Sequence, residues 1–142
     1  MKTLIVEDDF VSRRILKDIL SPMGDCDVAI DGSEAIQAFR LAWEDKTPYE
    51  LICMDIMMPK MDGQEALFKI RELEKTQGVR SRDEVKVIMI LALDSPKTVF
   101  ASYYRGGATS YLVKPITRDA VLGEIYNLGL QGPCRATVKQ PG

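Results

Sequence analysis

Five short apolar runs alternate along the chain with stretches in which apolar side chains recur every three or four residues. The runs are KTLIV (2–6), CDVAI (26–30), ELICM (50–54), VKVIMIL (85–91) and SYLV (110–113). Near-continuous runs of Val, Ile, Leu and Met are typical of strands that helices cover on both faces, as in parallel sheets. The pattern therefore predicts five buried parallel strands.

The stretches that follow the runs predict amphipathic helices. Their apolar positions are Val11, Ile15 and Ile19; Ala35, Ile36, Phe39 and Trp43; Ala66, Leu67, Ile70 and Leu73; Val99, Phe100 and Tyr103; and Val121, Leu122, Ile125 and Leu128. Capping boxes begin at Asp31 and Asp62, and Ser95 precedes a proline at a first helical position. Repeated strand–helix alternation predicts an α/β fold: a doubly wound, five-stranded parallel sheet of flavodoxin-like order 2-1-3-4-5, with helices on both faces.

The length of 142 residues suits a single domain. We expect one domain over residues 1–128, because helical periodicity ends there. Residues 129–142 contain Gly and Pro without periodicity and are predicted to be an irregular or disordered tail. The polar connections 43–50 and 75–84 are predicted to be solvated loops.

Composition narrows the cellular setting and the partners. No apolar run approaches the ~20 residues of a membrane span, and Glu7 arrives too early for a signal-peptide core, so we expect a cytoplasmic protein without a membrane partner. Nineteen basic and 21 acidic side chains give a net charge of −2 without a basic block. Direct binding to nucleic acid is therefore not expected.

The chain contains no histidine, which excludes catalytic triads, metal sites and phosphoryl carriers built on that residue. Cys26, Cys53 and Cys134 have neither paired nor zinc-binding spacing, so we expect reduced and mostly buried thiols. Any chemistry must therefore use carboxylates, lysine or hydroxyl groups.

Charged residues follow three of the predicted strands. The first strand ends in Glu7, Asp8 and Asp9, the third ends in Asp55, and the fifth ends in Lys114. In an open α/β sheet, ligands bind beyond the carboxyl ends of strands, where the strand order reverses. For the order 2-1-3-4-5 this point lies between the first and third strands. The fold is therefore expected to bring these charges together.

Carboxylates crowded at one edge repel each other unless a cation lies among them. Mg²⁺ suits such a site because it prefers hard oxygen ligands, and the backbone carbonyl of Met57 is a further candidate ligand. Asp55 could then act as a nucleophile toward phosphorus and form an aspartyl phosphate, with Lys114 stabilising the transferred group. Taken singly, each feature has a simpler interpretation: an acidic run can be a solvated helix start, and Asp55 can be an N-cap.

Three segments resemble the receiver domain of two-component response regulators, of the single-domain chemotaxis type. They are LIVEDD (4–9), MDIMMPKMDG (54–63) and GGATSYLVKPI (106–116), and the resemblance extends over residues 2 to about 128. It implies a phosphoprotein of a phosphorelay that accepts a phosphoryl group on Asp55 from a histidine kinase or a phosphotransfer protein. It also implies a signalling protein, not an enzyme in the usual sense, that assists its own phosphorylation and dephosphorylation.

The resemblance also assigns the other residues of the site. The acidic pair of the family falls on Glu7 and Asp8, with Asp8 as the preferred direct Mg²⁺ ligand and Asp9 as the alternative partner if the pair is counted one residue later. The invariant lysine falls on Lys114, and the aromatic switch residue falls on Tyr111.

One departure from the family pattern concerns the end of the fourth strand, where the family has Thr or Ser followed by Ala. This chain has MILALD (89–94). The hydroxyl position is Leu91 when the segment is aligned on Ala92, and Ala92 itself when it is counted back from Lys114. Neither residue carries a hydroxyl that could couple a phosphoryl group to Tyr111.

These observations leave three hypotheses. The first is a stand-alone receiver that is phosphorylated at Asp55 and signals to a downstream target protein through a surface near the fourth helix and the fifth strand. The second is a pseudo-receiver that serves as a constitutive protein-interaction module. It is suggested by Leu91, which stands in place of the hydroxyl residue of the family. The third is an aspartate-nucleophile phosphatase, which the chain fits least because Met57 stands where a second aspartate is needed.

Overall fold

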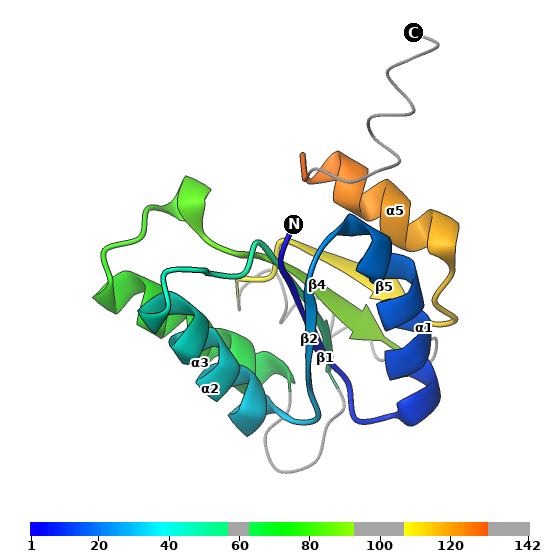
Figure 1. Ribbon diagram of the computed structural model, residues 1–142, viewed down its shortest axis with the longest axis horizontal. Coiled ribbons are helices and arrows are strands. Elements are labelled where there is room, and N and C mark those ends of the chain that lie inside the picture. The colour runs from blue at the N-terminus through cyan, green and yellow to red at the C-terminus, as the bar shows by residue number, and fades with distance from the viewer. Residues whose placement is uncertain (57–62, 93–106, 131–142) are drawn as a thin grey trace, which may run out of the picture.

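A five-stranded parallel sheet in the order β2-β1-β3-β4-β5 forms the centre of the protein, which confirms the predicted fold and strand order. The computed structural model describes residues 1–56, 63–92 and 107–130 (Figure 1). The strands are β1 (Thr3–Val6), β2 (Cys26–Ala29), β3 (Leu51–Asp55), β4 (Lys86–Leu91) and β5 (Ser110–Val113).

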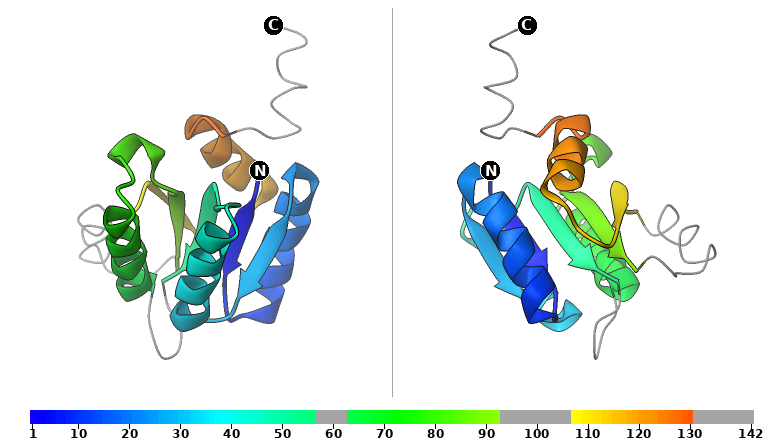
Figure 2. Two further views of the ribbon diagram at one scale, coloured as in Figure 1. Left: turned by 60° about the vertical axis from the view of Figure 1, so that its left-hand side comes forward. Right: turned by 90° about the vertical axis from the view of Figure 1, so that its right-hand side faces the viewer.

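Helices cover both faces of the sheet, as Figure 2 shows. One face carries α1 (Phe10–Leu20) and α5 (Arg118–Asn127), and the other carries α2 (Gly32–Glu44) and α3 (Gly63–Thr76). Two short 3₁₀ helices, η1 (Ser21–Met23) and η2 (Ser81–Asp83), precede β2 and β4. The predicted helix around residues 99–103, its start at Ser95 and the predicted cap at Asp62 lie outside the described residues.

The central strands are buried on both faces, as their continuous apolar sequences predict. Every residue of β1 and β3 is buried. Side chains alternate across the sheet, so that Ile52 and Met54 pack toward α2 and α3, whereas Leu51 and Cys53 pack toward α1 and α5. The two clusters fix the register of β3, because a shift by one residue would exchange its two faces.

The side-chain cap predicted at Asp31 begins α2. The Asp31 carboxylate accepts a hydrogen bond from the Glu34 N–H at 2.9 Å, and Glu34 accepts one in return from the Ile30 N–H at 3.0 Å. Helix α1 differs from the prediction in its buried face. It buries Leu16, Ile19 and Leu20, whereas the exposed fractions of Val11 and Ile15 are 62% and 38%.

The connection 43–50 is not the fully solvated loop that was predicted. Helix α2 extends to Glu44, and Tyr49 is buried. The Tyr49 hydroxyl donates a 2.6 Å hydrogen bond to Asp27, and the Lys2 ammonium lies 4.8 Å from the centre of the ring. These contacts offset the cost of burying the phenol in a connection between elements.

The predicted domain boundary at residue 128 falls at the C-cap of α5, and the boundary itself stays a prediction. Residues 131–142 of the predicted tail lie outside the described residues. Within the described part of the chain, no helix combines the length and the apolar character needed to cross a membrane.

Candidate functional site

The carboxyl ends of β1, β3 and β5 meet at one edge of the sheet. Asp55 is the last residue of β3, the position that the sequence predicts for it. Glu7 directly follows β1, and Lys114 directly follows β5. The Lys114 N–H donates a 2.7 Å hydrogen bond to the Leu91 carbonyl, which holds the start of the turn after β5 against the end of β4. Strand pairing therefore places these side chains at one edge.

Three carboxylates and one ammonium group converge there. Carboxylate oxygens of Glu7, Asp8 and Asp55 lie within 4.8 Å of one another. The Lys114 Nζ lies 3.2 Å from Asp55 Oδ2 and 3.6 Å from Glu7 Oε1. Asp55 and Glu7 are buried, whereas Asp8 is exposed, so the cluster extends from the core to solvent. Within the described part of the chain, one positive charge faces three acidic groups.

Glu7 is the unusual member of the cluster, because its residue is fully buried. Its Oε2 accepts a 3.2 Å hydrogen bond from the Asp9 N–H, but its Oε1 has no hydrogen-bond partner among the described residues. Burial, with a further contribution from neighbouring Asp55, raises the pKa of the Glu7 carboxyl to about 8. Partial burial lowers the pKa of Lys114, but the negative charges of Asp55 and Glu7 raise it by more, so the Lys114 pKa lies above its usual value.

The donor set fits a divalent cation. Its atoms are hard carboxylate oxygens, which Mg²⁺ and Ca²⁺ prefer, and they come from two adjacent strand ends. The buried Glu7 Oε1 has unused acceptor capacity, and such an atom is costly unless a ligand or water satisfies it. A cation among Glu7, Asp8 and Asp55 would supply the missing charge.

Two other candidate ligands are placed differently. The Asp9 carboxylate caps α1, where it accepts a 2.8 Å hydrogen bond from the Ser12 N–H, and this contact lowers the Asp9 pKa. Asp9 is not among the three residues of the cluster, so the geometry favours counting the acidic pair as Glu7 and Asp8. Met57 lies outside the described residues.

The candidate switch residues lie beside this edge. Leu91 ends β4 with no exposed surface and belongs to the same apolar cluster as Met54. Tyr111 on β5 is half-buried and packs against that cluster. Ala92 follows the strand and is also half-buried. An apolar side chain therefore occupies the position at which the resemblance led us to look for a hydroxyl.

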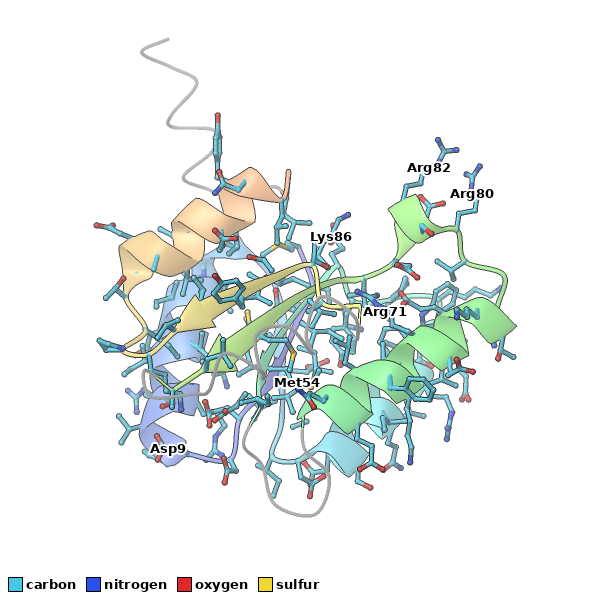
Figure 3. All side chains as sticks on the ribbon, turned by 180° about the vertical axis from the view of Figure 1, so that it is seen from behind. Asp9, Met54, Arg71, Arg80, Arg82 and Lys86 are labelled. Carbon is cyan, nitrogen blue, oxygen red and sulfur yellow. The ribbon has the colours of Figure 1, made fainter. Side chains whose placement is uncertain are left out.

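Sequence reasoning missed an exposed apolar surface next to the carboxylates. Phe10 and Val11, at the start of α1, have exposed fractions of 65% and 62%, and Ile15 follows one turn later with 38%. Figure 3 shows neighbouring Asp9 at this end of α1. The available signal was the apolar pair Phe10 and Val11 directly after the acidic run, of which only Val11 is assigned to the buried face by the helical spacing.

Sequence reasoning also missed a buried ion pair at the opposite end of the sheet. Arg71 and Glu74, both on α3, form a 2.7 Å salt bridge. The Arg71 guanidinium also donates two hydrogen bonds to the Gly107 carbonyl, at 3.0 and 2.8 Å, and one to the Val85 carbonyl at 2.9 Å. Arg71 therefore ties α3 to the segments that precede β4 and β5 (Figure 3).

Several solved structures share this fold. The receiver domain of the histidine kinase CKI1 from Arabidopsis thaliana, solved with Mg²⁺ and BeF₃⁻, has a TM-score of 0.73 and 28% identity over 89% of each chain. The receiver domain of Ssk1 from Saccharomyces cerevisiae, in a co-crystal with the phosphotransfer protein Ypd1, has a TM-score of 0.77 and 28% identity, covering 91% of this chain and 88% of that chain.

Curated proteins of similar sequence agree with these structural neighbours. The chemotaxis protein CheY of Treponema pallidum is 35% identical over 129 residues, which cover 89% of this chain and 81% of that protein. Hybrid signal transduction histidine kinase B of Dictyostelium discoideum is 37% identical over 126 residues, which cover 85% of this chain but only 6% of the kinase. The family model described as the response regulator receiver domain matches residues 3–126. The chain therefore belongs to the response regulator receiver domain family of two-component signalling, as its sequence motifs predicted.

Proposed function

We propose that Asp55 accepts a phosphoryl group from a phosphohistidine of a histidine kinase or a phosphotransfer protein. The single observation that carries the proposal is the convergence at Asp55: its carboxylate lies 3.2 Å from the Lys114 ammonium and within 4.8 Å of the Glu7 and Asp8 carboxylates. A buried nucleophile, a cation and additional oxygen donors are the parts that phosphoryl transfer requires.

In the proposed reaction an Asp55 carboxylate oxygen attacks phosphorus. An O–P bond forms, the P–N bond to the donor imidazole breaks, and the nitrogen keeps the electron pair. Lys114 binds an oxygen of the transferred group and stabilises its charge. Glu7, Asp8 and Asp55 would hold Mg²⁺, which neutralises charge between the carboxylates and the incoming phosphoryl group when it is bound. The same residues would then orient water for hydrolysis of the aspartyl phosphate.

A protein donor is supported by the exposed apolar surface of α1. Phe10, Val11 and Ile15 lie immediately after the acidic residues, so a protein that docks on them would bring its phosphohistidine close to Asp55. The Ssk1 receiver domain has been crystallised with such a phosphotransfer protein. We further propose that the phosphorylated chain signals to a downstream target through protein contacts. That it acts as a stand-alone unit stays a prediction.

Incubation with acetyl phosphate tests the chemistry directly. With Mg²⁺, intact mass spectrometry should find one phosphoryl adduct, and EDTA should abolish it, because the carboxylates then repel the phosphodonor. Asp55→Asn should carry no adduct with Mg²⁺ present. Absence of an adduct on the wild-type chain, or an equal adduct on Asp55→Asn, would contradict the proposal.

Substitutions of two phenylalanines of similar exposure distinguish transfer from a protein donor from transfer from a small-molecule donor. Phe10→Ala should slow transfer from a phosphohistidine protein but leave labelling by acetyl phosphate unchanged. Phe68→Ala is the matched control, since Phe68 is 61% exposed on α3 and should affect neither reaction. Equal slowing by both variants would argue against docking on α1.

A further inference from the structure

A groove of about 520 Å³ opens at the edge of the sheet opposite Asp55. Its lining includes Glu50 and Lys86, at the amino ends of β3 and β4, and the side chains of Trp43 and Tyr49. The volume lies within the range of ~300–1,000 Å³ that is usual for binding pockets. Figure 3 shows Lys86 at this end of the molecule, far from Asp9 at the start of α1.

The lining of the groove is net negative. It contains four carboxylates and two cationic side chains, which are Glu50, Glu74, Asp83 and Glu84, and Arg80 and Lys86. Three of the carboxylates already have cationic partners: Glu74 is paired with Arg71 at 2.7 Å, Asp83 with Arg80 at 3.2 Å, and Glu50 with the N-terminal ammonium group at 4.0 Å. Glu84 has no ion-pair partner within the described ranges, and Glu50 is exposed. The surface therefore suits a segment that is both apolar and basic.

Residues 131–142 have this composition and directly follow a residue of the groove lining. Leu130, which follows α5, forms part of the groove lining, and QGPCRATVKQPG (131–142) continues from it. This segment contains Arg135 and Lys139, the apolar residues Pro133, Val138 and Pro141, and no acidic residue. We propose that residues 131–142 dock in this groove, with Arg135 and Lys139 facing its carboxylates.

Because residues 131–142 are covalently linked to Leu130, weak contacts are sufficient to hold them in the groove. Because the segment starts at the groove lining, docking is intramolecular, and a short linker gives an effective concentration in the millimolar range. At ~3.3–3.6 Å per residue, Arg135 can reach any point within roughly 18 Å of Leu130. The proposal does not depend on phosphoryl transfer, because the groove and Asp55 lie at opposite edges.

Cys134 and Trp43 provide a native label and a native reporter. In a Cys26→Ser variant of the full chain, a nitroxide reagent should modify Cys134, because Cys53 is fully buried within β3. The single tryptophan gives one indole N–H resonance. Docking should broaden this resonance until most of its intensity is lost, relative to the same protein with the nitroxide reduced.

Charge reversal distinguishes docking from mere proximity. Arg135→Glu combined with Lys139→Glu, with the same label, should restore most of the Trp43 intensity, and Glu84→Lys should restore broadening in that variant. Raising the salt concentration to 1 M, where the Debye length is ~3 Å, should weaken broadening in the wild-type tail. Equal broadening with native and charge-reversed tails, or no broadening with either, would overturn the proposal.

Discussion

Two buried glutamates at opposite ends of the sheet differ in how completely their charges are satisfied. Glu74 is 1% exposed, and both its oxygens accept 2.7 Å hydrogen bonds, one from Arg71 and one from the Val85 N–H. Glu7 has no exposed surface, yet its Oε1 lacks a hydrogen-bond partner in the described part of the chain and lies 3.6 Å from Lys114. Burial is nearly equal, so burial alone does not distinguish a structural carboxylate from a functional one.

The surroundings of each carboxylate make the distinction. Arg71 brings a fixed positive charge to Glu74 and binds two backbone carbonyls as well, so the pair is complete without a ligand. Among the residues that the structure describes, Glu7 has two further acidic groups and one lysine around it. This edge is therefore stable only with protons or a cation, which is the condition of a binding site.

The largest expected effect on stability follows from removing the Arg71–Glu74 ion pair. Arg71→Met should lower the free energy of unfolding by about 3–5 kcal/mol, because Glu74 would remain buried without its cation. Urea denaturation of the purified variant measures the loss. Lys69→Met on the same helix is the control: its 3.7 Å bridge to Glu65 is exposed, and its loss should cost no more than ~1 kcal/mol. Similar losses for both variants would refute the structural role of Arg71.

The same Glu→Gln substitution at the two glutamates should change the free energy of unfolding in opposite directions. Glu74→Gln should lower the free energy of unfolding by about 1–3 kcal/mol, because the amide NH₂ group would face a hydrogen-bond donor. Glu7→Gln should raise it by on the order of 1 kcal/mol at pH 7 without metal, because folding then no longer requires the uptake of a proton at Glu7 that the unfolded chain releases. Only Glu7→Gln should abolish the stabilisation by Mg²⁺. Urea denaturation with EDTA and with Mg²⁺ gives all four values, and destabilisation by both variants would remove the contrast.

The edge with Glu7 could be predicted from the sequence, because parallel strands bring their carboxyl ends together. Once the apolar runs fixed five strands, Asp55 and Lys114 had to lie at one edge, whatever their side-chain contacts. The pair at the other edge could not be predicted. Arg71 binds the carbonyl of Gly107, which is 36 residues away, and no periodicity along the chain encodes such a contact.

The buried face of α1 shows a second limit. This helix has apolar residues around much of its circumference, so either the face with Val11 and Ile15 or the face with Leu16 and Leu20 could have packed on the sheet. The structure buries the second face. The choice depends on tertiary packing, which a single-helix pattern does not contain. The exposed residues were consequently assigned to the core.

Stability should depend on pH through Glu7 when metal is absent. The Glu7 pKa is about 8 in the folded protein, above its ordinary value of 4.5, so the folded state binds more protons than the unfolded state between these values. Stability in EDTA should therefore fall as pH rises from 5 to 8, by at most about 1.4 kcal/mol per pH unit. Unfolding curves at several pH values measure this slope.

Glu7→Gln supplies the control for the pH experiment, because it should flatten the slope in EDTA. Mg²⁺ should also oppose the fall, since a bound cation favours the ionised carboxylates. A wild-type slope that is unchanged by the substitution would assign the pH dependence to other groups.

The smallest effect concerns a thiol on the same strand as Asp55. Cys53 is fully buried in apolar surroundings, and this burial raises the pKa of its thiol to about 12. At pH 8 its thiolate fraction should be roughly a thousandfold below that of an ordinary cysteine, so its reaction with iodoacetamide should be negligible in the folded protein. In a Cys134→Ser variant, peptide mass spectrometry should find Cys26, which is half-buried, modified before Cys53, and urea should make both reactive. Equal rates without urea would show that β3 opens readily, and the buried carboxyl edge built on that strand could not then hold its acidic groups away from solvent.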